Sequence, residues 1–146
     1  MTFRRIDLQL PNDGDAMTRV ERNASRVLRL VAATSVERTR DVIQIDEGDE
    51  RGLVIVVTPD TIELRLPTIE WTHGAYGPRP SSRPSARLDP DELDDSELLA
   101  SIAQARAARE AEFTVCRYCG LSFPPEHRVA EDVCHGCASA HEGVVF

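Results

Sequence analysis

Residues 53–66 read LVIVVTPDTIELRL and hold the clearest structural pattern in the chain. An apolar run over 53–57 is followed by a four-residue turn, in which Pro59 takes the second position, where its fixed φ is favoured. Over residues 62–66 apolar side chains then alternate with charged ones, which is typical of a strand with one buried face. Because so short a connection joins antiparallel neighbours, the stretch predicts a β-hairpin.

Two further segments extend this hairpin into a sheet. Residues 42–45 form another short strand pattern, and the polar loop 47–52 joins it to the hairpin. Residues 6–10 alternate apolar and polar side chains and predict a half-buried strand, followed by a turn over 11–15. The short connections predict an antiparallel meander.

A helix is expected between the first strand and the others. Apolar residues from Ala16 to Val31 recur every three or four positions, which places them on one helical face. Asp13 or Asp15 is the candidate N-cap of this helix. One helix packed on one face of a small antiparallel sheet gives an α+β domain over residues 1–73.

The composition changes twice in the next forty residues. Residues 74–88 are rich in Gly, Pro and Ser and hold three Arg but no acid, which predicts a linker or extended arm. Residues 89–112 hold eight acids and two Arg and predict an acidic helix, with Asp89 as N-cap, Pro90 in the first turn and Glu92 completing a capping box. We interpret these acids as a solvated helix start, and an acidic docking face for a basic partner is the alternative.

Charge and composition limit the classes of function. The 146 residues carry 17 positive charges, all Arg, and 25 negative charges, for a net charge of −8. This field opposes sequence-independent binding to nucleic acid, because phosphates are repelled at long range. No apolar run approaches the ~20 residues of a membrane helix, and the first residues lack the apolar core of a signal peptide. We therefore expect a cytoplasmic protein without membrane contact.

All four cysteines lie in two C-x-x-C pairs near the C-terminus. The pairs are Cys116 with Cys119 and Cys134 with Cys137, separated by 14 residues. This spacing is typical of a tetrahedral Zn²⁺ site, in which four thiolates close the coordination shell and leave no open position for catalysis. Gly120 follows the first pair, where the backbone of such a turn often needs a positive φ. We predict one structural zinc ion bound by these four residues.

Residues 113–146 resemble the four-cysteine zinc fingers of the treble-clef and zinc-ribbon groups. The first pair with Gly120 matches the knuckle that both groups share. The second pair continues as CHGCASAHEG, which looks like a short helix starting at the metal, as in treble clefs; a ribbon more often has Gly where Ala138 stands. The resemblance implies zinc and a structural or interaction role, and it implies no particular partner.

Other roles for these side chains are less favoured than structural zinc. Two disulfides are disfavoured because cytosolic thiols stay reduced. Iron suits four thiolates, but the Gly and Pro pattern of rubredoxin's knuckles is incomplete here. His135 and His141 would be ligands only if a cysteine were not, so we interpret both as groups outside the coordination shell.

Two arginine-rich features are weaker candidates for binding. One is a stripe on the expected first helix, opposite its apolar face, made of Arg19, Arg22, Arg26 and Arg29. It could contact phosphates, but a solvated face neutralised by nearby acids is the favoured interpretation. The other is the arm of residues 71–87, with Trp71, Tyr76, Arg79 and Arg83. Such residues bind single-stranded nucleic acid or dock on proteins, although we favour Trp71 closing the core and Tyr76 fixing the linker.

Three functions remain open at this level. The first is a non-enzymatic zinc protein that acts as a protein-interaction or regulatory adaptor. The second is a nucleic-acid-binding protein that uses the stripe and the arm. The third is an enzyme with its site on the N-terminal sheet, which is least favoured because no nucleophile–base pair or small-molecule site can be read from the spacing.

Overall fold

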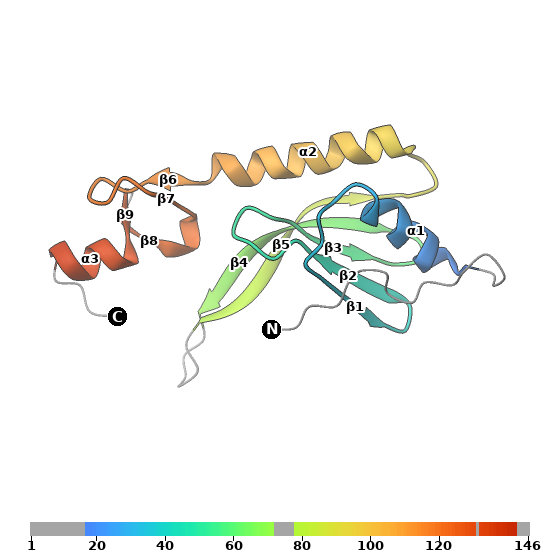
Figure 1. Cartoon of the computed structure of the whole chain (residues 1–146), viewed down its shortest axis with the longest axis horizontal. Helices are drawn as coiled ribbons and strands as arrows, with labels where there is room; N and C mark the ends of the chain where they lie inside the picture. Colours follow the sequence, from blue (N-terminus) through green and yellow to red (C-terminus); the bar gives the residue numbers. More distant parts are fainter. Residues whose placement is uncertain (1–16, 72–77, 131, 143–146) are drawn as a thin grey trace. The chain divides into compact units, whose positions relative to one another are not determined.

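An antiparallel meander organises the N-terminal part of the chain (Figure 1). The computed structural model describes residues 17–71, 78–130 and 132–142. Within them, five strands pair in chain order: β1 (Ser35–Thr39), β2 (Val42–Asp46), β3 (Val54–Val57), β4 (Ile62–Trp71) and β5 (Pro78–Leu88). The antiparallel strands predicted over 42–45, 53–57 and 62–66 are confirmed, as is the α+β class. The strand and turn expected over 6–15 lie outside the described residues.

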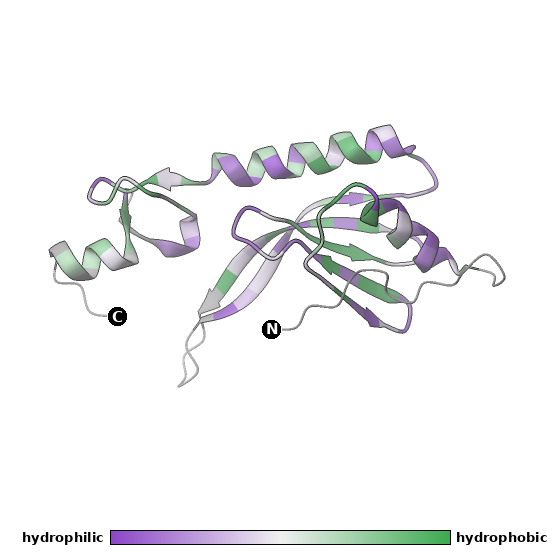
Figure 2. Ribbon diagram, viewed as in Figure 1, coloured by the Kyte–Doolittle hydropathy of each residue, from purple (hydrophilic) through white to green (hydrophobic). Residues whose placement is uncertain are grey.

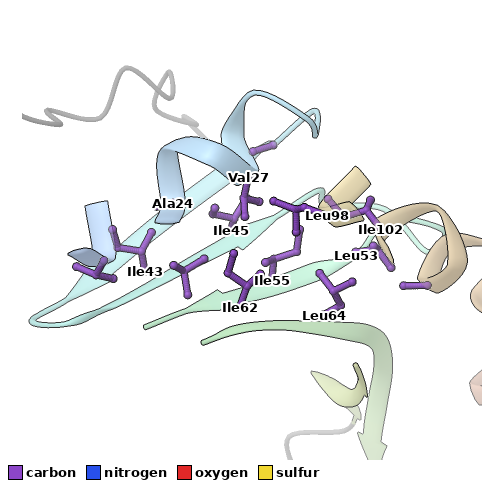
Figure 3. Packing of buried hydrophobic residues seen from close by; sticks show 14 of the residues in the cluster. Ala24, Val27, Ile43, Ile45, Leu53, Ile55, Ile62, Leu64, Leu98 and Ile102 are labelled. Atoms are coloured by element: carbon purple, nitrogen blue, oxygen red, sulfur yellow. The ribbon is translucent and has the colours of Figure 1, made fainter. Parts of the chain in front are cut away.

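The register of the strands places the buried apolar side chains on one face of the sheet. Two rows of buried side chains run across neighbouring strands: Ile43, Val57 and Ile62 form one row, and Ile45, Ile55 and Leu64 form the other. Because paired residues point to the same side of a sheet, both rows lie on one face. Figure 2 shows the hydrophobic colour concentrated in the central strands, and Figure 3 shows these side chains meeting those of the helices.

Helix α1 (Arg19–Leu28) packs on this face through Val20, Ala24 and Val27. Its N-cap is Thr18, so the expectation of Asp13 or Asp15 as the cap is wrong. The hydroxyl of Thr18 accepts the backbone N–H of Glu21 at 3.3 Å, and the carboxylate of Glu21 accepts the backbone N–H of Thr18 at 3.3 Å. This reciprocal capping box satisfies two donors at once, which explains why the helix begins there.

Residues 78–88, predicted as part of a linker, form the strand β5. They pair with β4 from Ile62 opposite Leu88 to Trp71 opposite Pro78, with a bulge beside Arg65. The linker interpretation is therefore wrong for these residues, while 74–77 lie outside the described residues. Prolines are tolerated here because, among the described strands, β5 pairs on one side only, and proline lacks just the N–H that a second neighbour would need.

Helix α2 (Asp95–Ala111) begins later than the sequence predicted. Asp94 accepts the backbone N–H of Glu97 at 2.8 Å, and Glu97 accepts that of Asp94 at 3.1 Å. Asp89 instead forms a preceding turn, because its carboxylate accepts the N–H of Asp91 at 2.9 Å. Both acid pairs have the capping-box spacing, and the helix starts at the pair that directly precedes the apolar stripe.

The stripe of α2 is buried in the N-terminal core. Leu98, Ile102 and Ala105 are at most 3% exposed and belong to the same cluster as α1 and the sheet (Figure 3). The sheet thus packs against two helices where the sequence predicted one. Three apolar residues at helical spacing are enough to bury one face of a helix whose other side is charged.

A second compact unit spans residues 108–146, after a first unit of residues 1–107. Its elements are β6 (Thr114–Val115), β7 (Ser122–Phe123), the 3₁₀ turn η1 (Pro125–His127), β8 (Arg128–Ala130), β9 (Val133–Cys134) and α3 (His135–Glu142). β6 pairs with β7 and β8 with β9, each antiparallel. Across the parts of the chain that the structure describes, the helices are too short or too polar to span a bilayer.

Candidate metal centre

The first cysteine pair lies on the turn of the β6–β7 hairpin. The N–H of Cys116 donates to the carbonyl of Leu121 at 2.9 Å, and the N–H of Gly120 donates to the carbonyl of Cys116 at 2.9 Å. Gly120 has a φ of +74°, a conformation that side-chain-bearing residues rarely adopt. The turn predicted from Cys116, Cys119 and Gly120 is thus present, and it directs both sulfurs to one side.

The second pair lies where β9 meets α3. Cys134 ends β9, and Cys137 lies in the first turn of α3. The N–H of Arg117, in the first pair's turn, donates to the carbonyl of Asp132 at 2.9 Å, just before β9. This bond holds the two C-x-x-C segments side by side.

The four sulfur atoms converge. All lie within 4.8 Å of one another. A tetrahedral site with Zn–S bonds of about 2.3 Å requires sulfur–sulfur separations of about 3.8 Å, which this cluster meets with small adjustments. The group formed by Cys116, Cys119, Cys134 and Cys137 can therefore hold a metal ion.

The thiols differ in acidity for structural reasons. Hydrogen bonds from the backbone N–H groups of Cys119 and Cys134 lower the pKa of the Cys116 thiol to about 6. Burial, together with the neighbouring thiols, raises the pKa of Cys137 to about 12. Thiols this crowded repel one another once ionised, and a cation among them removes that repulsion. Metal binding to this group is thus coupled to proton release.

A buried ion network lies in the same unit as the cysteines. The side chain of Arg109 is fully buried and donates to Glu126 at 2.5 and 3.1 Å and to Glu112 at 3.1 Å. Its guanidinium also lies 5.0 Å from the centre of the Phe113 ring. Burial alone would lower the pKa of Arg109, but the two carboxylates raise it above its usual value. Sequence reasoning missed this network, because only the Arg109–Glu112 spacing was visible in the sequence.

Comparisons of the chain with known protein families, with curated proteins and with solved structures found no match. The resemblance to four-cysteine fingers therefore has no relative to support it. The metal assignment rests on the donor set and on its geometry.

Three of the four arginines in the α1 stripe pair with acids of the same unit. Arg19 lies 2.7 Å from Asp91, and Arg26 donates to Asp95 at 2.8 Å and to two backbone carbonyls in the turn before α2. Arg29 lies 3.5 Å from Asp95, while Arg22 donates to the carbonyl of Met17 at 2.8 Å. Three of the four charges of the stripe are thus paired within the chain by Asp91 and Asp95, two of the acids expected at the helix start, which are themselves 70% and 52% exposed.

The arm is a two-stranded ribbon. β3 pairs with β4 only as far as Arg65, so among the described residues the rest of β4 pairs with β5 alone. Arg79, which is exposed, and Arg83 lie two strand repeats apart and so share one face of the ribbon. Trp71 is the last residue of β4, and its role in the core stays a prediction; Tyr76 lies outside the described residues.

A cavity of about 230 Å³ lies beside the loop between β2 and β3. Among its lining residues, Glu47 accepts both arms of Arg106, at 2.6 and 2.7 Å, and the N–H of Leu53 at 2.9 Å. These bonds occupy the carboxylate, which is only 6% exposed. The arrangement connects α2 to the loop between β2 and β3.

Proposed function

We propose that this chain is a non-enzymatic zinc-binding protein that acts as a protein-interaction or regulatory adaptor. The convergence of four cysteine sulfurs within 4.8 Å carries the proposal. Four thiolates complete a zinc shell and leave no position for a water or a substrate, so the metal's role is structural.

The finger is proposed to be of the treble-clef type. Two features support this: Cys137 lies in the first turn of a helix, and a second small hairpin, β8–β9, directly precedes that helix. A segment of this size cannot bury a sufficient core on its own, so metal binding supplies folding free energy.

A protein partner is favoured over nucleic acid by charge. Residues 108–146 contain three Arg and six acids, and a zinc ion with four thiolates adds a formal charge of −2. Phosphate backbones are repelled by such a surface, whereas a basic protein segment is attracted.

Metal analysis of the purified protein tests the proposal. We expect one zinc per chain, and a cobalt-loaded sample with the thiolate-to-metal charge-transfer absorption of a four-sulfur site. Cys119→Ser should reduce metal retention, and Ser101→Ala should leave it unchanged. Iron in place of zinc, or a metal content far below one per chain after reduction, would contradict the zinc assignment.

A second candidate is nucleic-acid binding by the β4–β5 ribbon. The observation in its favour is that β5 carries Arg79, Arg83 and Arg87 and no acid. Fluorescence anisotropy with labelled DNA and RNA at two salt concentrations tests it. Tight binding that weakens steeply with salt and is lost in an Arg79→Ala, Arg83→Ala double variant would favour this candidate.

A further inference from the structure

The knuckle of the finger carries exposed apolar side chains. Within the described residues, five large hydrophobic side chains are exposed, and three of them lie on the β6–β7 hairpin and its turn (Figure 1). These three, Val115 (59% exposed), Tyr118 (41%) and Leu121 (69%), are called the knuckle patch below. They lie within seven residues of one hairpin, and apolar residues exposed close together mark interaction sites more often than isolated ones do.

The hairpin is apolar on two sides. Cys116 and Phe123 are 1% and 5% exposed, so they supply the interior of the unit. Val115 directly precedes Cys116 and Leu121 lies two residues before Phe123, yet both remain in solvent. The core of the finger is therefore complete without the knuckle patch.

The patch is held in a fixed conformation. The hydrogen bonds between Cys116 and Leu121 and between Gly120 and Cys116 fix the turn. The guanidinium of Arg117 lies 5.1 Å from the centre of the Tyr118 ring and within 3.7 Å of Asp132. A surface ordered before binding loses little conformational entropy when a partner docks.

The charge of this unit restricts the partner. Its six acids outnumber its three Arg, so residues 108–146 keep a net negative charge even with Arg109 paired to Glu112 and Glu126. A second copy of the chain would bring the same negative charge to the contact, and an anionic membrane would also be repelled. A basic segment with apolar side chains matches both the patch and the field around it.

We propose that the knuckle patch is the docking site for a basic, amphipathic segment of a partner protein. Its apolar side chains contact Val115, Tyr118 and Leu121, and its Lys or Arg residues are attracted by the net negative charge of residues 108–146. This inference rests on the proposed adaptor function and names the surface and the chemistry that it uses.

Selection of a displayed library of random 12-residue peptides on the zinc-loaded full chain tests the proposal. We expect enriched peptides to combine aliphatic or aromatic residues with a net positive charge. A synthetic peptide of the enriched sequence should bind about tenfold or more weakly to Leu121→Ser and to Val115→Ser than to the wild type. Its affinity should also fall as salt is raised.

Val42→Ser is the matched control, since Val42 is 39% exposed but lies on β2 of the other unit. It should bind the peptide as the wild type does. Enriched peptides that are neutral or acidic, or binding that Leu121→Ser leaves unchanged, would overturn the proposal. So would a concentration-dependent dimer in sedimentation that Leu121→Ser abolishes, because the occupant would then be a second copy.

The zinc content of every variant separates this inference from the function on which it rests. If the wild type holds no zinc, the proposed function itself fails. If the zinc content is one per chain in the wild type and in Leu121→Ser, and no peptide is enriched, the docking inference alone is overturned.

Discussion

Arg109 shows how one buried charge supports the finger. Its side chain is fully buried, and Glu126, its closest partner, is 8% exposed. Removing a buried cation leaves its carboxylate partner desolvated and unpaired, which costs far more than the net contribution of the intact pair. The cost of losing an ion pair thus depends on burial more than on distance.

We expect Arg109→Met to destabilise the zinc-loaded unit of residues 108–146 by about 3–5 kcal/mol, because Glu126 would stay buried without its cation. Thermal unfolding of the zinc-loaded protein, followed through release of the metal, measures this loss. Arg117→Met is the control, since Arg117 is 51% exposed and lies 3.7 Å from Asp132. It should cost at most about 1 kcal/mol; equal effects of the two variants would contradict the role given to burial.

Glu21 makes the stability of the N-terminal unit depend on pH. Hydrogen bonds with the side chain of Thr18 lower the pKa of Glu21 below its usual value of 4.5, and Arg38 acts in the same direction. Because the pKa of Glu21 is lower in the folded state than in the unfolded state, its ionised carboxylate stabilises the fold at pH values above the pKa of the unfolded state. That contribution is lost as the pH falls through the folded pKa.

We expect Glu21→Gln to lower the free energy of unfolding by about 1 kcal/mol at pH 7, through the loss of a charged capping partner. The difference between variant and wild type should shrink as the pH falls below 4.5. Urea unfolding at pH 7 and at progressively lower pH measures it. A difference that stays constant over that range would show that the charge of Glu21 is not involved.

At the scale of elements, the turn before α2 is fastened to α1 by Arg26. This guanidinium donates to Asp95 and to the carbonyls of Pro90 and Leu93, at 2.6–2.8 Å. Arg22, on the same helix, donates only to the nearby carbonyl of Met17 among the bonds described for it. The two residues therefore form a matched pair, one with long-range contacts and one with a local contact.

Arg26→Ala should destabilise the N-terminal unit by about 1.5–3 kcal/mol, because hydrogen bonds with charged groups are lost. Arg22→Ala should change stability by no more than about 0.5 kcal/mol. Hydrogen exchange at the start of α2 reports the local effect. Unchanged protection there in Arg26→Ala would contradict a fastening role for these bonds.

The elements that the sequence predicts well have periodic side chains. The alternation over residues 62–66 and the helical spacing after Ala16 identified β4 and α1, since burial of one face imposes these periods. β5 was missed because its prolines resemble those of a linker, and only its place at the edge of the described sheet makes them acceptable. The sequence pattern places the start of α2 at the wrong acid pair, because Asp89 with Glu92 and Asp94 with Glu97 have the same spacing.

The candidate metal site, like the fold, is predictable only where the signal is local in the sequence. The four cysteines were predicted, because a C-x-x-C spacing encodes a local turn that presents two sulfurs. The pairing of Arg109 with Glu126 is not predictable from the sequence, because only the folded unit brings these two residues together. The pairing of Arg19 with Asp91 and of Arg26 with Asp95 likewise joins residues distant in the sequence.

At the scale of the whole molecule, the chain divides into two units with different sources of stability. Residues 1–107 bury a shared core of sheet and helix side chains. Residues 108–146 have short strands and a small interior, and they contain the four cysteines whose sulfurs converge. Removal of a metal should therefore affect the two units unequally.

The central claim is that one zinc ion, held by Cys116, Cys119, Cys134 and Cys137, folds the C-terminal unit. The most direct measurement is a two-dimensional amide NMR spectrum of the full chain before and after zinc is removed by a chelator under reducing conditions. The account predicts that the signals of residues 108–146 collapse to unfolded positions and return when zinc is added, while those of the sheet stay dispersed. Signals of residues 108–146 that are unchanged without metal, or a collapse of the whole spectrum, would contradict it.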